Sequence, residues 1–198
     1  MASLTTKERI LLAAVQLFSD VGFDNVSMRD IAKIAGIQAP SIYNHFESKQ
    51  QLLSSIYEYF TKNQAAAIPD VAELLEKAAT SPVADIISRL EYQYPPAIEE
   101  TMGRILLIAC QRLAIDRRSE QFIFDRFFSV TDGLYRPVLS RLVELGRIQP
   151  LDIDAFIRLV TFHSYSMAVL SYSQLCDDPQ GCRDSQRLMH SLIQTVPD

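Results

Sequence analysis

Residues 27–46, "SMRDIAKIAGIQAPSIYNHF", decide the fold of this chain. Two short segments with apolar residues at helical spacing stand on either side of Gly36, as in two helices joined by a tight turn. Ser27 followed by Asp30 predicts the cap of the first helix, and Gly36 predicts its end. Pro40 is tolerated in the first turn of the second helix, where N–H groups have no intrahelical partner. We therefore expect a helix-turn-helix unit.

The second helix, residues 38–46, has two chemically different sides. At 100° per residue, Ala39, Ile42 and Phe46 share one side, which can pack on the rest of the unit. The other side carries amide, hydroxyl and imidazole groups, from Gln38, Ser41, His45 and, further round, Asn44. In a helix-turn-helix, the second helix enters the DNA major groove, and such groups suit base edges and phosphates. The segment therefore predicts DNA binding.

The rest of the chain is also predicted to be helical. A first helix begins at the capping box Thr5-x-x-Glu8 and ends near Gly22, and a fourth begins at Ser48-x-x-Gln51 and runs to about residue 67. Further helices are expected at 71–79, 82–93, 96–114, 120–145, 153–175 and 182–195. Pro137 should kink or split the helix that contains it. Strand alternation is absent from the sequence. We expect an all-α chain of about nine helices, with a three-helix domain over 1–50 and a helical bundle over 51–198.

Composition favours a soluble, cytoplasmic protein. The chain has 198 residues and a formal net charge of -5, which argues against a uniformly basic nucleic-acid coat but not against a local site. Its three cysteines form no CxxC pair and its three histidines have no metal-binding spacing, so neither a metal nor a cofactor is expected. The apolar segment after Arg9 is interrupted by Gln16, and no segment reaches the roughly 18 apolar residues of a membrane span.

Residues 5–53 resemble the DNA-binding domain of the TetR family of transcriptional regulators. The matching motifs are Ser27-x-Arg29-x-Ile31-Ala32, Ala35-Gly36, Tyr43-x-His45-Phe46 and Lys49-x-x-Leu52-Leu53. The resemblance implies an all-α homodimer that responds to a ligand and acts as a repressor or, less often, an activator. It also implies a set of DNA-binding residues: Ser27, Met28, Arg29, Gln38, Ala39, Pro40, Ser41, Tyr43, Asn44, His45 and Lys49.

Within this set, the resemblance implies different roles. Ser27 and Arg29 would meet phosphates or base edges at the start of their helix. Gln38, Ala39, Ser41 and Asn44 would face the bases, and Tyr43, His45 and Lys49 would hold phosphates. Ala39 is a departure, because family members that read a base at this position carry a longer polar side chain. We therefore expect base reading to rest on Gln38, Ser41 and Asn44. Taken singly, Tyr43 could be a packing residue and His45 a structural histidine.

The C-terminal part carries no catalytic motif but is rich in aromatic residues. Most of these belong in a core, and the remainder could line a ligand pocket, which the resemblance places in this bundle. The candidate ligand-binding residues are Tyr92, Phe127, Phe128, Phe162 and Tyr165, with polar contacts from Arg104, Arg112 and His163.

The predicted helix 153–175 is apolar on several faces. Either a second copy of the chain or burial within one chain would account for this. The resemblance favours dimerisation through the last two helices, with Phe156, Val160, Met167, Leu170, Leu188 and Leu192 as candidate interface residues.

Together these features predict a homodimeric regulator that binds double-stranded DNA at a palindromic operator and is released from it by a small hydrophobic or aromatic effector. The alternative is a helical ligand-binding or protein-interaction module that keeps the fold without operator binding. An enzyme is not expected, since the sequence contains no catalytic constellation.

Overall fold

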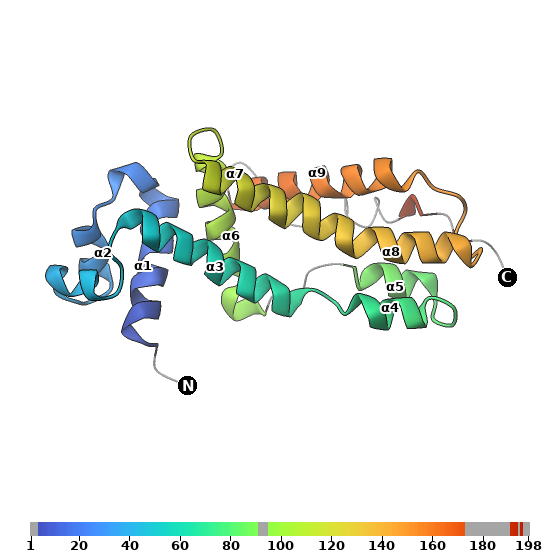
Figure 1. Cartoon of the computed structure of the whole chain (residues 1–198), viewed down its shortest axis with the longest axis horizontal. Helices are drawn as coiled ribbons and strands as arrows, with labels where there is room; N and C mark the ends of the chain where they lie inside the picture. Colours follow the sequence, from blue (N-terminus) through green and yellow to red (C-terminus); the bar gives the residue numbers. More distant parts are fainter. Residues whose placement is uncertain (1–3, 91–94, 173–190, 194, 196–198) are drawn as a thin grey trace. The chain divides into compact units, whose positions relative to one another are not determined.

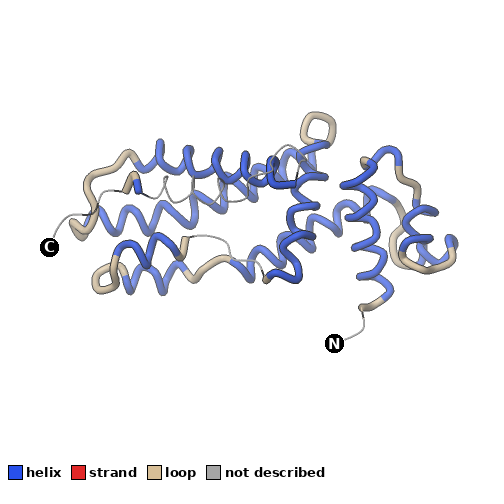
Figure 2. The backbone as a smooth tube through the Cα atoms, turned by 180° about the vertical axis from the view of Figure 1, so that it is seen from behind, coloured by secondary structure: helices blue, strands red, loops and turns tan. Residues whose placement is uncertain are grey.

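The computed structural model describes residues 4–90, 95–172, 191–193 and 195, and the regular structure of these residues is helical (Figures 1 and 2). The helices are α1 (Thr6–Val21), α2 (Met28–Ile34), α3 (Lys49–Ala67), α4 (Val71–Lys77), α5 (Val83–Ser88), α6 (Pro96–Arg112), α7 (Arg117–Ile123), α8 (Val130–Glu144) and α9 (Ile153–Tyr172). Two 3-10 segments, η1 (Phe23–Asn25) and η2 (Ala39–Asn44), and one π-helical segment, η3 (Phe124–Ser129), lie between them. The described residues contain no strand beyond an isolated bridge between Ile148 and Thr195. The predicted all-α class is confirmed.

The chain divides into two compact units. The first comprises residues 1–63 and 95–122, and the second comprises residues 64–94 and 123–198. No described helix is long and apolar enough to cross a bilayer.

In the first unit, α1 packs against α6 and α2, and α2 packs against η2. The fully buried side chains of this unit include Phe18 of α1, Ile31 of α2, Ile42 of η2 and Ile56 of α3. Burial of a side chain of this size contributes about 1.5–3 kcal/mol. Each short helical piece therefore depends on its neighbours for stability, because helices this short are marginal in isolation.

Two predicted helix starts of the first unit are confirmed by their caps, whereas the box expected at Ser48-x-x-Gln51 is incomplete, because the Gln51 side chain accepts from Glu47 N. Thr5 and Glu8 form a capping box, with Glu8 N donating to Thr5 Oγ1 at 3.2 Å. Ser27 and Asp30 form a second box, and its hydrogen bonds lower the pKa of the Asp30 carboxyl. After α2 the chain turns at Gly36, where φ is +68°, a left-handed conformation that favours glycine.

The second unit packs α4, α5, α8 and α9 around one core, and Figure 1 shows these helices alongside one another. The core residues include Leu74, Ile86, Leu139 and Phe156. Arg147 closes the α4–α5 turn by donating to the carbonyl oxygens of Ala78, Ala79 and Ser81.

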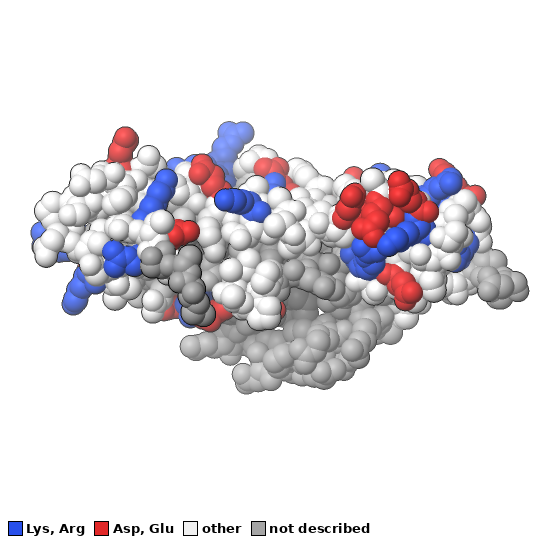
Figure 3. All heavy atoms as spheres, turned by 90° about the horizontal axis from the view of Figure 1, so that it is seen from below, with Lys and Arg blue, Asp and Glu red and all other residues white. Residues whose placement is uncertain are grey.

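Ionic contacts at the surface of the second unit pair opposite charges. On the face shown in Figure 3, acidic and basic side chains mix where α4 and α5 lie. Glu73 of α4 pairs with Lys77 (2.6 Å) and Arg89 (3.0 Å), so its negative charge is balanced within the unit.

Two sequence expectations in this unit need correction. The helix expected over 120–145 is interrupted by the π-helical η3. Pro137 does not split it, since Pro137 lies inside the continuous α8, and the expected kink there stays a prediction. The helix expected over 82–93 ends at Ser88, because the next residues turn through Arg89. Most of the helix expected over 182–195 lies outside the described residues.

Candidate nucleic-acid interface

The second helix expected for the helix-turn-helix is η2, and its backbone is a 3-10 helix. Ser41 N donates to Gln38 O at 2.9 Å and His45 N to Ile42 O at 3.0 Å, each across three residues. In a 3-10 helix, side chains three residues apart eclipse one another. Ser41 and Asn44 therefore lie in one row, and Gln38 precedes them as the extended N-cap of η2. This corrects the α-helical wheel, which set Asn44 apart from Ser41.

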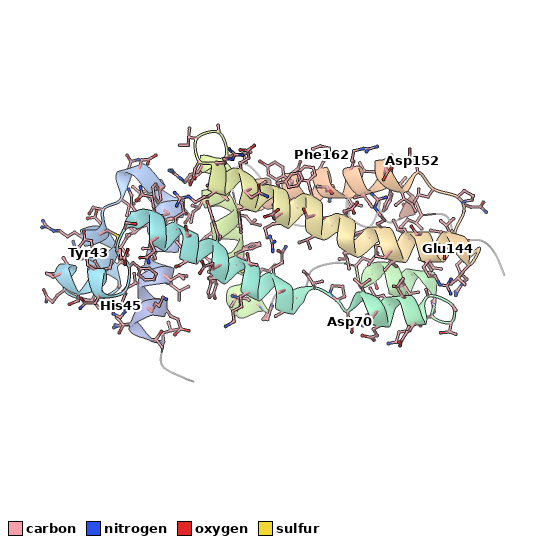
Figure 4. The ribbon with its side chains drawn as sticks, in the orientation of Figure 1. Tyr43, His45, Asp70, Glu144, Asp152 and Phe162 are labelled. Atoms are coloured by element: carbon pink, nitrogen blue, oxygen red, sulfur yellow. The ribbon has the colours of Figure 1, made fainter. Side chains whose placement is uncertain are left out.

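Two buried side chains anchor η2 to its domain. Ile42 and Phe46 are 0% and 1% exposed, so that side of η2 packs in the core of the first unit. Tyr43, Asn44 and His45 lie between these anchors in sequence but are exposed, and Figure 4 labels Tyr43 and His45 on this segment. The anchoring fixes the backbone while the outward side chains stay in contact with solvent.

The outward polar side chains keep their hydrogen-bonding capacity. Within the described part of the chain, the structure gives neither a hydrogen bond nor an ion pair to the side chains of Arg29, Gln38, Ser41, Tyr43, Asn44 or His45. Buried polar groups normally have internal hydrogen-bond partners, whereas these side chains are largely exposed and can exchange water for a ligand. A row of solvent-accessible groups without such partners is available to bind a ligand.

Three other predicted DNA-binding residues have internal contacts. The side chain of Met28 is buried in the core. The Ser27 hydroxyl belongs to the capping box of α2. Lys49 Nζ donates to two backbone carbonyl oxygens, Phe23 O at 2.7 Å and Val26 O at 2.8 Å. These residues support the segment that leads into α2, and their DNA contacts stay predictions.

Phe23 of η1 is a support that sequence reasoning missed. Two cations lie over its ring: Lys49 Nζ is 4.4 Å from the centroid, and Arg112 Cζ is 4.0 Å from it. Arg112 also donates to the carboxylate of Asp24 from Nη1 (3.3 Å) and pairs with Asp116. The start of α3 and the end of α6 are thus both fixed to η1. No local motif could reveal this contact, because Arg112 is far from Phe23 in sequence.

The predicted effector residues do not all gather in one place. Arg104 belongs to the first unit, where its guanidinium pairs with Asp20 and Glu100 and donates to Ser19. Arg112 is held at η1 in the same unit. Tyr92 lies outside the described residues.

Four of the predicted effector residues do meet, in the second unit. Phe127 of η3 packs edge-on against Tyr165 of α9, with ring centroids 5.3 Å apart, and Phe128 packs in the same way against Phe162 at 5.9 Å. Phe124, which was not predicted, stacks on Phe128 at 5.4 Å. The π-helical turn of η3 presents these rings, and such turns are frequent at functional sites.

Polar groups are also found among the helices of the second unit. Burial lowers the pKa of His163, which follows Phe162 on α9. Arg126 of η3 donates to Oε1 of the buried Gln64 at 3.3 Å, a pair that the sequence did not reveal.

The predicted dimer residues fall into three groups. Phe156 and Val160 are buried in the core of the second unit. Leu192 is exposed. Leu188 and the side chains of Met167 and Leu170 lie outside what the structure describes. The exposed apolar side chains of the described part of α9 are instead Leu159 and Phe162 (46% and 54% exposed).

Comparison with known sequences identifies the N-terminal domain. Residues 10–56 match the family model "Bacterial regulatory proteins, tetR family". The chain is 27% identical over 140 residues to the "Uncharacterized HTH-type transcriptional regulator YerO" of Bacillus subtilis (strain 168), a match that covers 71% of this chain and 47% of YerO. It is 43% identical over 56 residues to the "Biofilm operon icaADBC HTH-type negative transcriptional regulator IcaR" of Staphylococcus aureus (strain Newman), 28% of each chain. The chain thus spans less than half the length of either relative.

Comparison with solved structures extends the likeness of fold to most of the chain. The TetR family transcriptional regulator PfmR from Thermus thermophilus superposes with a TM-score of 0.67, covering 93% of this chain and 96% of that chain. The two are 24% identical in sequence, so the likeness is one of fold. The resemblance expected from the sequence is confirmed, and the matched proteins are regulators rather than enzymes.

Proposed function

We propose that the chain is a member of the tetR family of bacterial regulatory proteins, whose model matches residues 10–56, and that it is a sequence-specific DNA-binding transcriptional regulator that works as a homodimer in the cytoplasm. The observation that carries the proposal is the outward side of η2. Ser41 and Asn44 form an eclipsed row on η2, and Gln38 stands at its N-cap; all three side chains lack internal partners among the described residues, and buried Ile42 and Phe46 fix the backbone.

The chemistry of this row suits base reading rather than general attraction to DNA. Amide side chains can make paired hydrogen bonds to adenine, and a hydroxyl can contact any of several base edges. The nearby guanidinium of Arg29 suits a phosphate, and so do the exposed hydroxyl of Tyr43 and ring of His45. The low formal charge of the chain is compatible with this division, because affinity would come from few phosphate contacts.

A homodimer would present two copies of η2 to a palindromic operator. Two-fold symmetry places equivalent recognition segments on half-sites about one DNA turn (~34–36 Å) or a multiple of it apart. Leu159 and Phe162 support a contact between copies through α9, since both are large apolar side chains exposed on one helix.

We propose a small hydrophobic or aromatic effector for the second unit. The rings of Phe124, Phe127, Phe128, Phe162 and Tyr165 supply an apolar, aromatic environment, and Arg126 and His163 add polar groups. If effector and operator favour different states of the dimer, each weakens the binding of the other by about 1–3 kcal/mol. Repression is favoured over activation by the likeness of the N-terminal domain to IcaR, a negative regulator.

Selection of DNA ligands from a random library by the full-length protein tests the proposal. We expect enrichment of a palindrome. In fluorescence-anisotropy titrations with that palindrome, Gln38→Ala should weaken binding about 10-fold, the loss of a good base contact. The matched control is Gln121→Ala, an exposed glutamine of α7, which should bind as the parent protein does.

Failure to enrich any palindrome, with no shift of random duplex DNA at low salt, would overturn the proposal. That result would favour the alternative, a helical module that keeps the fold without operator binding.

A further inference from the structure

A hollow on the surface of the first unit lies beside the polar row of η2. It has a volume of about 390 Å³ and is lined by Arg29, Ala39, Pro40 and Tyr43. The volume is at the small end of the range for ligand sites, large enough for part of a nucleotide. The hollow is formed where two helices begin, because Arg29 is in the first turn of α2 and Ala39 is the first residue of η2.

Two of the four residues that line the hollow have apolar side chains. Ala39 contributes a methyl group and Pro40 a ring, and Pro40 also has no backbone N–H to donate. Tyr43 is three residues after Pro40, so in a 3-10 helix its ring lies in the same row, where it is 56% exposed. The guanidinium of Arg29 is the cationic group among the four.

The apolar row and the hydrogen-bonding row are adjacent on η2. In the DNA major groove, the four bases differ in donors and acceptors, and thymine alone among them carries a methyl group. Ala39 and Pro40 cannot recognise a donor or an acceptor through their side chains, but they can enclose a methyl group. The short side chain of Ala39 therefore leaves space for a base substituent that a longer side chain would fill.

We propose that this hollow selects a thymine at one position of each half-site by enclosing its 5-methyl group against Ala39 and Pro40, with Arg29 on a neighbouring phosphate. The inference rests on the proposed operator binding and adds the identity of one base. Ala39 then contributes to specificity by shape, although it forms no hydrogen bond through its side chain.

Single replacement of thymine by deoxyuridine in the enriched operator tests the inference, because it removes only the methyl group. The full-length parent protein is titrated with a set of operators in which one symmetric pair of thymines at a time is replaced. Burial of one methyl group is equivalent to about a 4-fold change in affinity. We expect that replacing one symmetric pair of thymines weakens binding about 10-fold or more, because one methyl group is lost from each of the two half-sites. Replacing the other pairs should have no effect.

Two variants then assign the effect to residues. Ala39→Gly removes the methyl wall, so the ratio between the thymine and deoxyuridine operators should fall close to one at the sensitive pair. Ser41→Ala, the matched control on the neighbouring row, should weaken binding to both operators and keep the ratio. Arg29→Met should also weaken both operators equally and make the salt dependence shallower, since its predicted contact is to phosphate.

The possible outcomes distinguish failure of the methyl site from failure of operator binding. If no thymine pair is sensitive, the methyl site is overturned while operator binding stands. If a pair is sensitive and Ala39→Gly keeps the full ratio, the methyl group is read elsewhere and the inference is overturned. Absence of any enriched operator overturns the proposed function itself. If Ala39→Gly does not fold, Ala39→Ser serves instead: its added hydroxyl enters the hollow, so the ratio should fall at the sensitive pair, and an unchanged ratio would overturn the inference.

Discussion

Replacement of Lys49 by methionine tests whether this residue supports the domain or binds DNA. Methionine keeps most of the apolar stem but removes an ammonium that donates to Phe23 O (2.7 Å) and Val26 O (2.8 Å) and lies 4.4 Å from the Phe23 centroid. A hydrogen bond from a charged donor contributes about 1.5–3 kcal/mol and a cation–π contact about 0.5–1 kcal/mol when partly exposed. Because Lys49 is half-buried, we take the low ends and expect the free energy of unfolding to fall by about 3.5 kcal/mol.

The assay is urea unfolding followed by far-UV circular dichroism at one protein concentration, since the stability of a dimer depends on concentration. Lys62→Met is the matched control: Lys62 is an exposed lysine of the same helix, and its loss should change stability by less than about 0.5 kcal/mol. Equal stability of the two variants would refute the supporting role. If Lys49→Met then weakened DNA binding uniformly and reduced the salt slope by about one, Lys49 would be a phosphate ligand, as the family resemblance implied.

Three further perturbations probe other features of the fold. Burial raises the pKa of Tyr57 to about 12, whereas an ordinary tyrosine has a pKa of about 10. Between these pH values the unfolded chain has lost a proton that the folded chain keeps, so the free energy of unfolding should fall by about 1.4 kcal/mol per pH unit. Tyr57→Phe should remove this slope in urea titrations at about pH 9–11.5. Gly36→Ala should lower the free energy of unfolding by about 1–2 kcal/mol, because φ at this position is +68°. Gly133→Ala inside α8 should raise it by about 0.5–1 kcal/mol, since the added Cβ would meet nothing within 4 Å. Melting temperatures of the two variants that shift in the same direction would contradict this expectation. Arg112→Lys keeps the charge but not the planar group over Phe23, and a loss of about 1–2 kcal/mol in urea unfolding is expected; an unchanged midpoint would show that the contact contributes nothing.

The caps and the helix-turn-helix could be predicted from the sequence because they depend on residues close together in the chain. Each capping box, Thr5 with Glu8 and Ser27 with Asp30, satisfies free N–H groups within one helical turn. Gly36 is required locally because the backbone there has a positive φ. The 3-10 geometry of η2 could not be predicted in this way. Over so short a segment, repeats of about 3.0 and 3.6 residues differ too little for the apolar pattern to separate them.

The contacts that hold η1 could not be predicted either, for a different reason. Lys49 matches a phosphate-binding position of the family motif, and only the folded chain brings the carbonyls of Phe23 and Val26 to its ammonium. The apolar faces of α9 were equally ambiguous. Phe156 and Val160 suited either a second copy or the core of the unit, and burial of both in that core leaves Leu159 and Phe162 as the exposed apolar residues in the described part of this helix.

Four cations of the first unit differ in how they are held. Arg104, Arg112 and Lys49 are held by carboxylates, carbonyls or an aromatic ring, and they stabilise the contacts of α6 and α3 with α1 and η1. Arg29 has no ion pair within the described residues and stands at the edge of the recognition surface. If the chain binds an operator as proposed, the engagement of these three cations reduces nonspecific attraction to DNA, and contacts with bases must supply a larger share of the affinity. Discrimination between sequences would then depend on the uncharged row of η2 and on the apolar hollow beside it, which would read different properties of a base pair from adjacent positions.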